Sequence, residues 1–79
     1  MKIVDARGLK CPMPIVKAKK EVDALQPGES VEVRATDPGS VADFKGWAKT
    51  AKNAQLTSQR EEQDEQGRTI FVHVLERKA

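Results

Sequence analysis

The sequence predicts an α/β protein built as an α+β two-layer sandwich, with two helices on one face of a four-stranded mixed sheet. Strand-like alternation and helix-like 3.6-residue spacing follow one another along the chain in the order βαβαββ. The 79 residues are enough for one two-layer core. Right-handed crossovers would place both helices on the same face and leave the other face only partly covered. We therefore expect residues 1–79 to form one domain.

The first half of the chain predicts a strand, a helix and a second strand. Residues 2–5 have the pattern of a short strand. Apolar side chains then recur at helical spacing over residues 15–25, and the Gln-Pro-Gly of residues 26–28 ends that helix. Residues 30–35 alternate between apolar and polar side chains, which indicates a strand with one buried face.

The second helix has two candidate starts. Asp37 fits an N-cap with Pro38 at the first helical position. Ser40 followed by Asp43 fits a competing start about three residues later. Asn53 can adopt the left-handed conformation that ends a helix, so we expect the helix to finish there.

The last two strands differ in polarity. Residues 56–62 carry little apolar surface, residues 64–67 predict a hairpin turn, and residues 69–76 are apolar on both faces. A strand with two apolar faces belongs inside a sheet, and a polar strand belongs at an edge. The strand of residues 69–76 is therefore predicted to be internal and that of residues 56–62 to be an edge.

The amino-acid composition argues against several classes of function. The net charge is +2, there is no Tyr, and the only aromatic residues are Phe44, Trp47 and Phe71, so a base-stacking nucleic-acid surface is not expected. The apolar runs are too short to span a membrane, and the N-terminus resembles a strand rather than a signal peptide. A single cysteine suits a reducing compartment, so we expect a cytoplasmic protein.

Cys11 is the only cysteine, and it stands where a strand gives way to a helix. The partial positive charge of a helix N-terminus makes a thiol easier to ionise. Pro12 disfavours helical dihedrals at Cys11 and indicates that Cys11 is the N-cap. Pro14 has no amide hydrogen, so only the Met13 amide would remain to stabilise a sulfur anion.

Other thiol chemistries lack the residues they need. There is no second cysteine for a Cys-x-x-Cys cycle, and one Cys with one His cannot complete a zinc site. His73 could serve as a base for Cys11 in a hydrolase, but we interpret it as a solvent-facing strand residue. No cofactor or metal is expected. A sulfur without base, resolving thiol or pocket fits a carrier that holds a group and passes it on.

The motifs around this cysteine resemble the TusA/SirA-like family of small sulfur-carrier proteins. The resemblance lies in Asp-Ala-Arg-Gly-Leu-Lys-Cys-Pro-Met-Pro at residues 5–14, Leu-Gln-Pro-Gly-Glu at residues 25–29, and Asp37-Pro38. It implies a fold similar to the C-terminal domain of bacterial translation initiation factor three. It also implies a persulfide on Cys11, received from a cysteine desulfurase or rhodanese and passed to an acceptor protein. In that family the sulfur serves tRNA thiolation or another sulfur-transfer pathway.

Partner docking is expected around the start of the first helix. Arg7 and Lys10 would favour the sulfur anion and meet acidic partner surfaces, with Met13 as an adaptable contact between Pro12 and Pro14. The opposing interpretation makes the charged residues solubilising and Met13 part of the core. An RNA- or protein-binding regulatory module without sulfur chemistry is the alternative function. Direct nucleic-acid binding is not expected, because acidic residues are interspersed among the lysines of residues 17–23.

Overall fold

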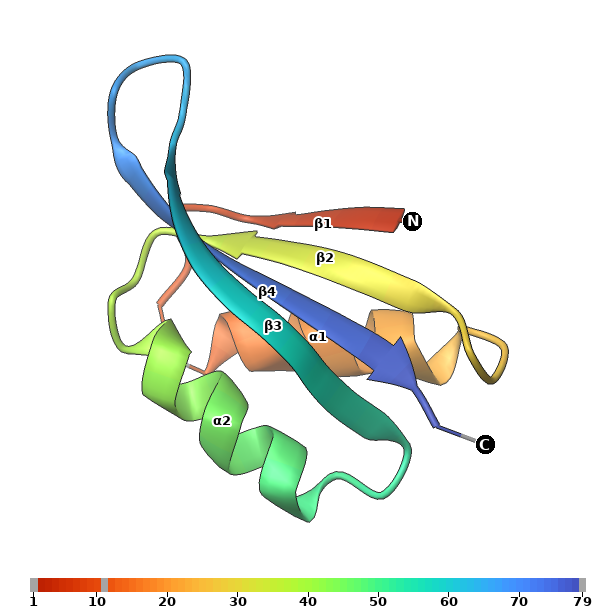
Figure 1. Cartoon of the computed structure of the whole chain (residues 1–79). Helices are drawn as coiled ribbons and strands as arrows, with labels where there is room; N and C mark the ends of the chain where they lie inside the picture. Colours follow the sequence, from red (N-terminus) through yellow and green to blue (C-terminus); the bar gives the residue numbers. More distant parts are fainter. Residues whose placement is uncertain (1, 11, 79) are drawn as a thin grey trace.

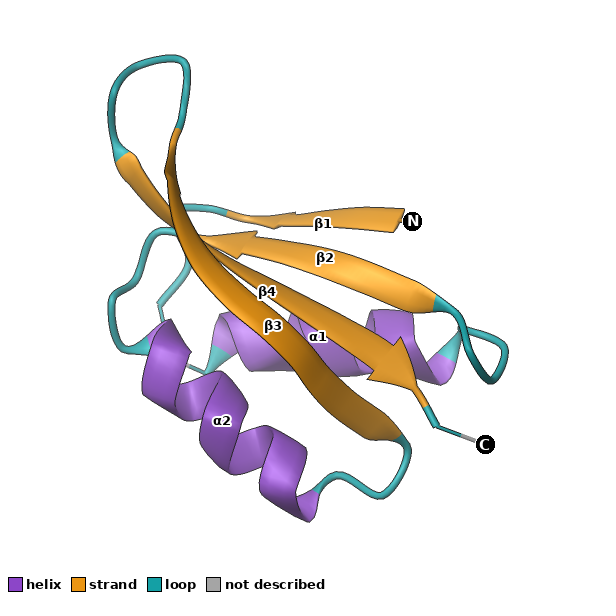
Figure 2. Cartoon of the chain, viewed as in Figure 1, coloured by secondary structure: helices purple, strands orange, loops and turns teal. Residues whose placement is uncertain are grey.

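The computed structural model describes residues 2–10 and 12–78 and has the predicted two-layer architecture. Both helices lie on one side of the sheet, and no element covers the other side (Figure 1; Figure 2). The predicted element order and layering are therefore confirmed. The elements are β1 (Lys2–Ala6), α1 (Met13–Asp23), β2 (Ser30–Ala35), α2 (Ser40–Thr50), β3 (Ala54–Gln63) and β4 (Thr69–Arg77).

The strand order in the sheet is β1-β2-β4-β3. β1 pairs with β2 in parallel, and β4 pairs antiparallel with both β2 and β3. β4 is internal because it has apolar side chains to bury on both faces: Leu75 faces the helices, and Val72 on the opposite face is also fully buried. β3 is an edge strand, so both strand predictions are confirmed.

A β-bulge explains how the polar edge strand still contributes to the core. Leu56 lies opposite Leu75 and Ser58 lies opposite Val74, so one extra residue is inserted on β3. The insertion reverses the alternation of side chains, because a strand has a period of two. Leu56 and Gln59 consequently both face the helices.

The core lies between the helices and the sheet. Phe44 of α2 is fully buried, and the Trp47 ring packs edge-on against it at a centroid distance of 6.3 Å. Burial of a side chain of this size stabilises the fold by about 1.5–3 kcal/mol. Ala18 and Val22 supply the buried stripe of α1, with Ile15 and Leu25 partly buried beside them. The helical spacing of residues 15–25 therefore identified the core side of α1.

The ends of α2 differ from the prediction. The helix begins at Ser40 with Gly39 as N-cap, and the Asp37 carboxylate instead accepts the Gly39 amide hydrogen bond at 3.0 Å. At the other end the C-cap is Ala51 in an extended conformation. No described residue other than glycine has a positive φ, so the left-handed ending at Asn53 is wrong. The Asn53 side chain donates to Asp23 Oδ1 at 2.8 Å, which ties this loop to α1.

The open face of the sheet is covered by paired charges rather than by a helix. Glu32 accepts hydrogen bonds from Arg34 at 2.8 Å and from Arg60 at 3.0 Å, and Arg60 also pairs with Glu62. In the sheet register Val72 lies between Arg34 and Arg60. Because the aliphatic parts of arginine side chains can cover apolar surface, Val72 is fully buried on a face without a second layer.

Candidate functional site

The candidate site is the loop that joins β1 to α1. Cys11, its central residue, lies outside the residues that the structure describes. The preceding part of the loop is attached to the sheet: the Gly8 amide donates to Thr36 Oγ1 at 2.9 Å, and the Leu9 amide donates to the Ala6 carbonyl at 3.3 Å. Gly8 has φ +80°, a conformation that other residues rarely adopt. The end of β2 thus fixes the direction in which the chain leaves β1.

The first turn of α1 begins one residue later than predicted. Pro12 is the N-cap, with φ −96° and ψ 13°, and it provides no side-chain hydrogen bond. The Met13 amide donates to the Lys10 carbonyl at 2.9 Å. The prediction that Cys11 is the N-cap and that the Met13 amide is free for a sulfur anion is therefore wrong. Pro14, buried in the first turn, presents no amide hydrogen at all.

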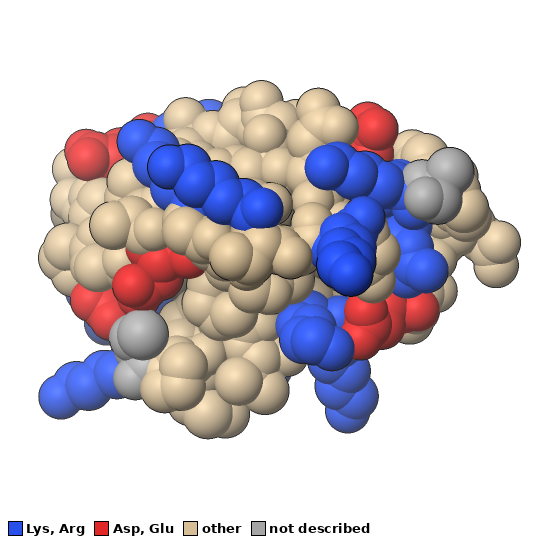
Figure 3. Space-filling model, turned by 90° about the horizontal axis from the view of Figure 1, so that it is seen from below, with Lys and Arg blue, Asp and Glu red and all other residues tan. Residues whose placement is uncertain are grey.

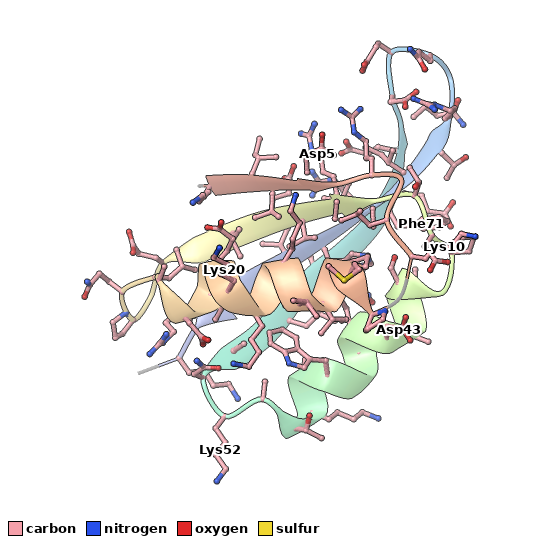
Figure 4. All side chains as sticks on the ribbon, turned by 180° about the vertical axis from the view of Figure 1, so that it is seen from behind. Asp5, Lys10, Lys20, Asp43, Lys52 and Phe71 are labelled. Atoms are coloured by element: carbon pink, nitrogen blue, oxygen red, sulfur yellow. The ribbon has the colours of Figure 1, made fainter. Side chains whose placement is uncertain are left out.

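The two cations of the loop, Arg7 and Lys10, differ in whether they form an ion pair. The Arg7 guanidinium donates to both carboxylate oxygens of Asp5, at 3.0 and 3.2 Å, and lies 3.8 Å from Glu65. The Arg7 hydrogen bonds lower the pKa of Asp5, and the bond to Asp5 raises the pKa of Arg7. Lys10 is exposed and has no ion pair among the described residues (Figure 4). The cation with a free charge beside residue 11 is thus Lys10.

A hollow of about 520 Å³ adjoins the start of the loop. Arg7 and Arg68 both line it, and Arg68 is paired with Asp64 of the β3–β4 turn at 3.3 Å. Thr36 is the residue here that the sequence analysis missed, because nothing in its local sequence indicates contact with Gly8. The hollow is lined by Asp5, Arg7, Gly8, Thr36, Arg68 and Thr69.

Two apolar side chains stand exposed on the first half of α1. Met13 is 47% exposed and Val16 is 51% exposed. They are three residues apart and lie on the same side of the helix. Val16 was not singled out from the sequence, although its position off the buried stripe of α1 was a usable signal. The exposure of Met13 contradicts the alternative in which it packs inward.

His73 is fully buried, so its interpretation as a solvent-facing residue is wrong. Its ring stacks on Phe44 at a centroid distance of 4.4 Å. Its Nε2 lies 2.9 Å from Ser40 Oγ, and its Nδ1 lies 3.0 Å from Gln59 Nε2. Burial lowers the pKa of His73 to about 4. With both nitrogens occupied and the ring neutral, His73 joins α2, β3 and β4 and has no free nitrogen to act as a base.

The tautomer of His73 follows from its partners. Gln59 Nε2 can only donate, and it also donates to the Val41 carbonyl at 3.0 Å. Nδ1 must therefore accept a hydrogen bond, so the proton is on Nε2, which donates to Ser40. Neither Ser40 nor Gln59 was predicted to contact His73. The bulge of β3 is what turns Gln59 toward it.

No group of three or more His, Cys, Asp or Glu side chains among residues 2–10 and 12–78 could hold a metal ion. Neither helix of this part of the chain is long and apolar enough to cross a membrane.

Comparison with known proteins places the chain in a family. A family model described as Sulfurtransferase TusA matches residues 2–73. The Sulfur carrier protein TusA of Allochromatium vinosum is 48% identical over 58 residues, which cover 73% of this chain and 76% of that protein. A candidate sulfur carrier protein of Halobacterium salinarum is 46% identical over 72 residues, which cover 91% of this chain and 83% of that protein.

Two further proteins differ in how much of their length this chain matches. The chain is 49% identical over 59 residues to YrkF, a candidate sulfur carrier protein of Bacillus subtilis, but the match covers only 32% of YrkF. The crystal structure of a SirA-like protein from Desulfitobacterium hafniense aligns with a TM-score of 0.68 and 25% identity, over 95% of this chain and 96% of that one. Sequence and fold thus agree, and the chain belongs to the TusA family of sulfur carriers.

Proposed function

We propose that the protein carries sulfur as a persulfide on Cys11. One observation carries the proposal: in a chain of the TusA family, the only cysteine stands in a Cys-Pro-Met-Pro segment at the start of α1. The thioethers of the methionines cannot hold a transferable sulfur atom. We further propose that residues 1–79 act as one TusA-like domain, since both helices pack on the same sheet.

The chemistry is thiol exchange in two steps. The Cys11 thiolate attacks the outer sulfur of a donor persulfide, an S–S bond forms on Cys11, and the donor leaves as a thiolate. An acceptor thiolate then attacks the outer sulfur of Cys11 and releases the Cys11 thiolate. Each step breaks one S–S bond and forms another, so no external oxidant or reductant is needed. A cysteine desulfurase or rhodanese fits the donor role, and the sulfur could serve tRNA thiolation or another pathway.

The surface around the start of α1 supports docking of the donor. Lys10 offers an unpaired cation, and Met13 and Val16 offer exposed apolar contacts. Arg7 is engaged with Asp5 in the free protein, so a partner carboxylate would have to compete for it. We therefore expect Lys10 to contribute more to the association rate than Arg7.

Mass spectrometry tests the proposal directly. Protein incubated with a cysteine desulfurase and cysteine should gain the mass of one sulfur atom, and a reducing agent should remove it. Cys11→Ser should remain unmodified while its circular dichroism and unfolding transition match those of the wild type. Sulfur gain or transfer by Cys11→Ser at the wild-type rate would show that Cys11 is not the carrier. A wild-type chain that never gains sulfur would favour the regulatory alternative.

A further inference from the structure

A second surface feature is a groove of about 260 Å³ between α2 and the edge strand β3. Its apolar floor comes from Val41 in the first turn of α2 and Phe71 of β4, both half-buried. The groove is lined by Val41, Lys45, Gln59, Arg60, Glu61 and Phe71.

The floor remains uncovered because β3 is polar where it passes the start of α2. Glu61 lies opposite Phe71 in the sheet, and Gln59 lies opposite His73. Neither side chain can cover apolar surface as a leucine would. The Gln59 amide is fixed by its hydrogen bonds to the Val41 carbonyl and to His73 Nδ1. The wall of the groove is thus held in place by the buried histidine.

The charged side chains around the groove differ in whether they already have a partner. Lys45 lines it, and Lys49 follows one turn later on α2; neither ammonium group has an ion pair or hydrogen bond among the described residues. Arg60 is engaged by Glu32 and Glu62 on the open face of the sheet. Glu61 has no ion pair in the same part of the chain and repels anions from the β3 side. The free positive charge therefore lies along α2.

We propose that this α2–β3 groove binds an acidic segment of a partner protein, with one apolar side chain on Val41 and Phe71 and its carboxylates along Lys45 and Lys49. The apolar floor provides the anchor, and the two unpaired lysines determine the charge of the occupant. Nucleic acid fits less well, because the half-buried Phe71 presents only part of its ring for base stacking. None of the described residues that line the groove belongs to the β1–α1 loop, so we expect this binding to be independent of sulfur loading.

An NMR titration tests the groove with a defined probe. The probe is a capped peptide in which one phenylalanine has two acidic residues on each side. Amide shifts of the ¹⁵N-labelled full chain should move most at Val41, Lys45, Gln59, Glu61 and Phe71. A matched peptide with alanine in place of phenylalanine should bind at least about fivefold more weakly.

Two double variants separate the groove from general charge attraction. Lys45→Glu with Lys49→Glu should weaken peptide binding at least about tenfold. Lys20→Glu with Lys52→Glu changes the net charge equally, also replaces unpaired lysines, and lies away from the groove (Figure 4), so it should change affinity by less than about twofold. Cys11→Ser should bind like the wild type, which separates this test from that of the proposed function.

Several outcomes would overturn the proposal. They are the absence of shifts at millimolar peptide, shifts spread over all lysines or centred on residues 10–16, and equal weakening in the two double variants. Tighter binding of an oligouridine than of the peptide, at the same salt concentration, would assign the surface to nucleic acid instead.

Discussion

The helix layer and the open face of the sheet use positive charge in different ways. On the helix side lysines extend into solvent, and five of them have no ion pair or hydrogen bond among the described residues (Figure 3). All five arginines of the chain, by contrast, donate hydrogen bonds to carboxylates or to a backbone carbonyl. These five lysines are Lys10, Lys20, Lys45, Lys49 and Lys52, and the ammonium of Lys78, which follows β4, also has no such partner.

The physical chemistry of the two side chains accounts for this division. An arginine can bind a carboxylate through two donors and can cover apolar surface with its stem, as Arg34 and Arg60 do beside Val72. A lysine ammonium is a strongly hydrated point charge that gains little from a fixed partner at the surface. The arginines of the open face thus stabilise the sheet, whereas the five lysines of the helix side keep their charges unpaired at the surface.

The largest expected effect comes from removing the aromatic core of the helix layer. Phe44→Ala should lower the free energy of unfolding by about 3–5 kcal/mol, because Phe44 is fully buried and supports both Trp47 and His73. Urea unfolding followed by tryptophan fluorescence measures this loss. A loss below about 1 kcal/mol would mean that α2 is not anchored through this ring.

The second-largest expected effect is a loss of stability at acidic pH, caused by His73 on the face of the sheet that the helices cover. His73 has its pKa lowered to about 4 by burial, against about 6.5 in an unfolded chain. The unfolded state therefore binds the extra proton first as the pH falls. The contribution of neutral His73 is fully present above about pH 6.5, is lost progressively between there and pH 4, and amounts to about 3 kcal/mol.

The free energy of unfolding, measured from pH 7 to pH 4, gives the slope of stability against pH and checks this prediction. His73→Gln should be less stable at pH 7, but its stability should depend much less on pH in that window. No charged side chain is bonded to the ring, since its partners are Ser40, Gln59 and Phe44. An unchanged slope in His73→Gln would assign the acid sensitivity to other groups.

A smaller effect should follow from breaking the ion pairs of the open face. Glu32→Gln would leave Arg34 and Arg60 without their shared carboxylate and should cost about 1 kcal/mol at low salt. Added salt should reduce the difference from wild type. Lys45→Gln, on the helix side, is the matched control. It should leave the free energy of unfolding almost unchanged, because that lysine has no partner to lose among the described residues.

The pH window of the open face is distinct from that of His73. Although burial of Glu32 opposes it, hydrogen bonds from Arg34 and Arg60 lower the pKa of this carboxyl group. Its folded pKa is below its unfolded value, so its contribution is present above about pH 4.5 and is lost only as the pH falls further. Glu32→Gln should therefore alter the pH dependence below pH 4.5 and leave the window above it unchanged.

The smallest effect is a stabilisation on the outer side of α2. Gly46 has an ordinary φ, and a Cβ atom built there meets nothing within 4 Å. Gly46→Ala should raise the free energy of unfolding by about 0.5–1 kcal/mol through helix propensity alone. Thermal unfolding measures this gain. A destabilised Gly46→Ala would show that the glycine has a role inside the fold.

Local patterns in the sequence were sufficient for the element order, the internal position of β4 and the core side of α1. These features depend on the alternation of residues 69–76 and the helical spacing of residues 15–25, which are properties of neighbours in the chain. The cysteine motif likewise lies in one continuous segment and led to the correct family. Helix ends were less predictable: Asp37 and Asn53 both formed side-chain hydrogen bonds other than the expected caps.

Only the tertiary structure decided three features of the protein: the surroundings of His73, the covering of Val72 by paired charges on the open face, and the α2–β3 groove. A lone histidine in a strand resembles a surface residue until a bulge in β3 turns Gln59 toward it and α2 brings Ser40 to its other nitrogen. Which lysines stay unpaired also depends on residues distant in sequence. Sequence determines which segments are apolar on which face, because periodicity is local, whereas pairing and burial of single polar groups depend on contacts that form only when the layers pack.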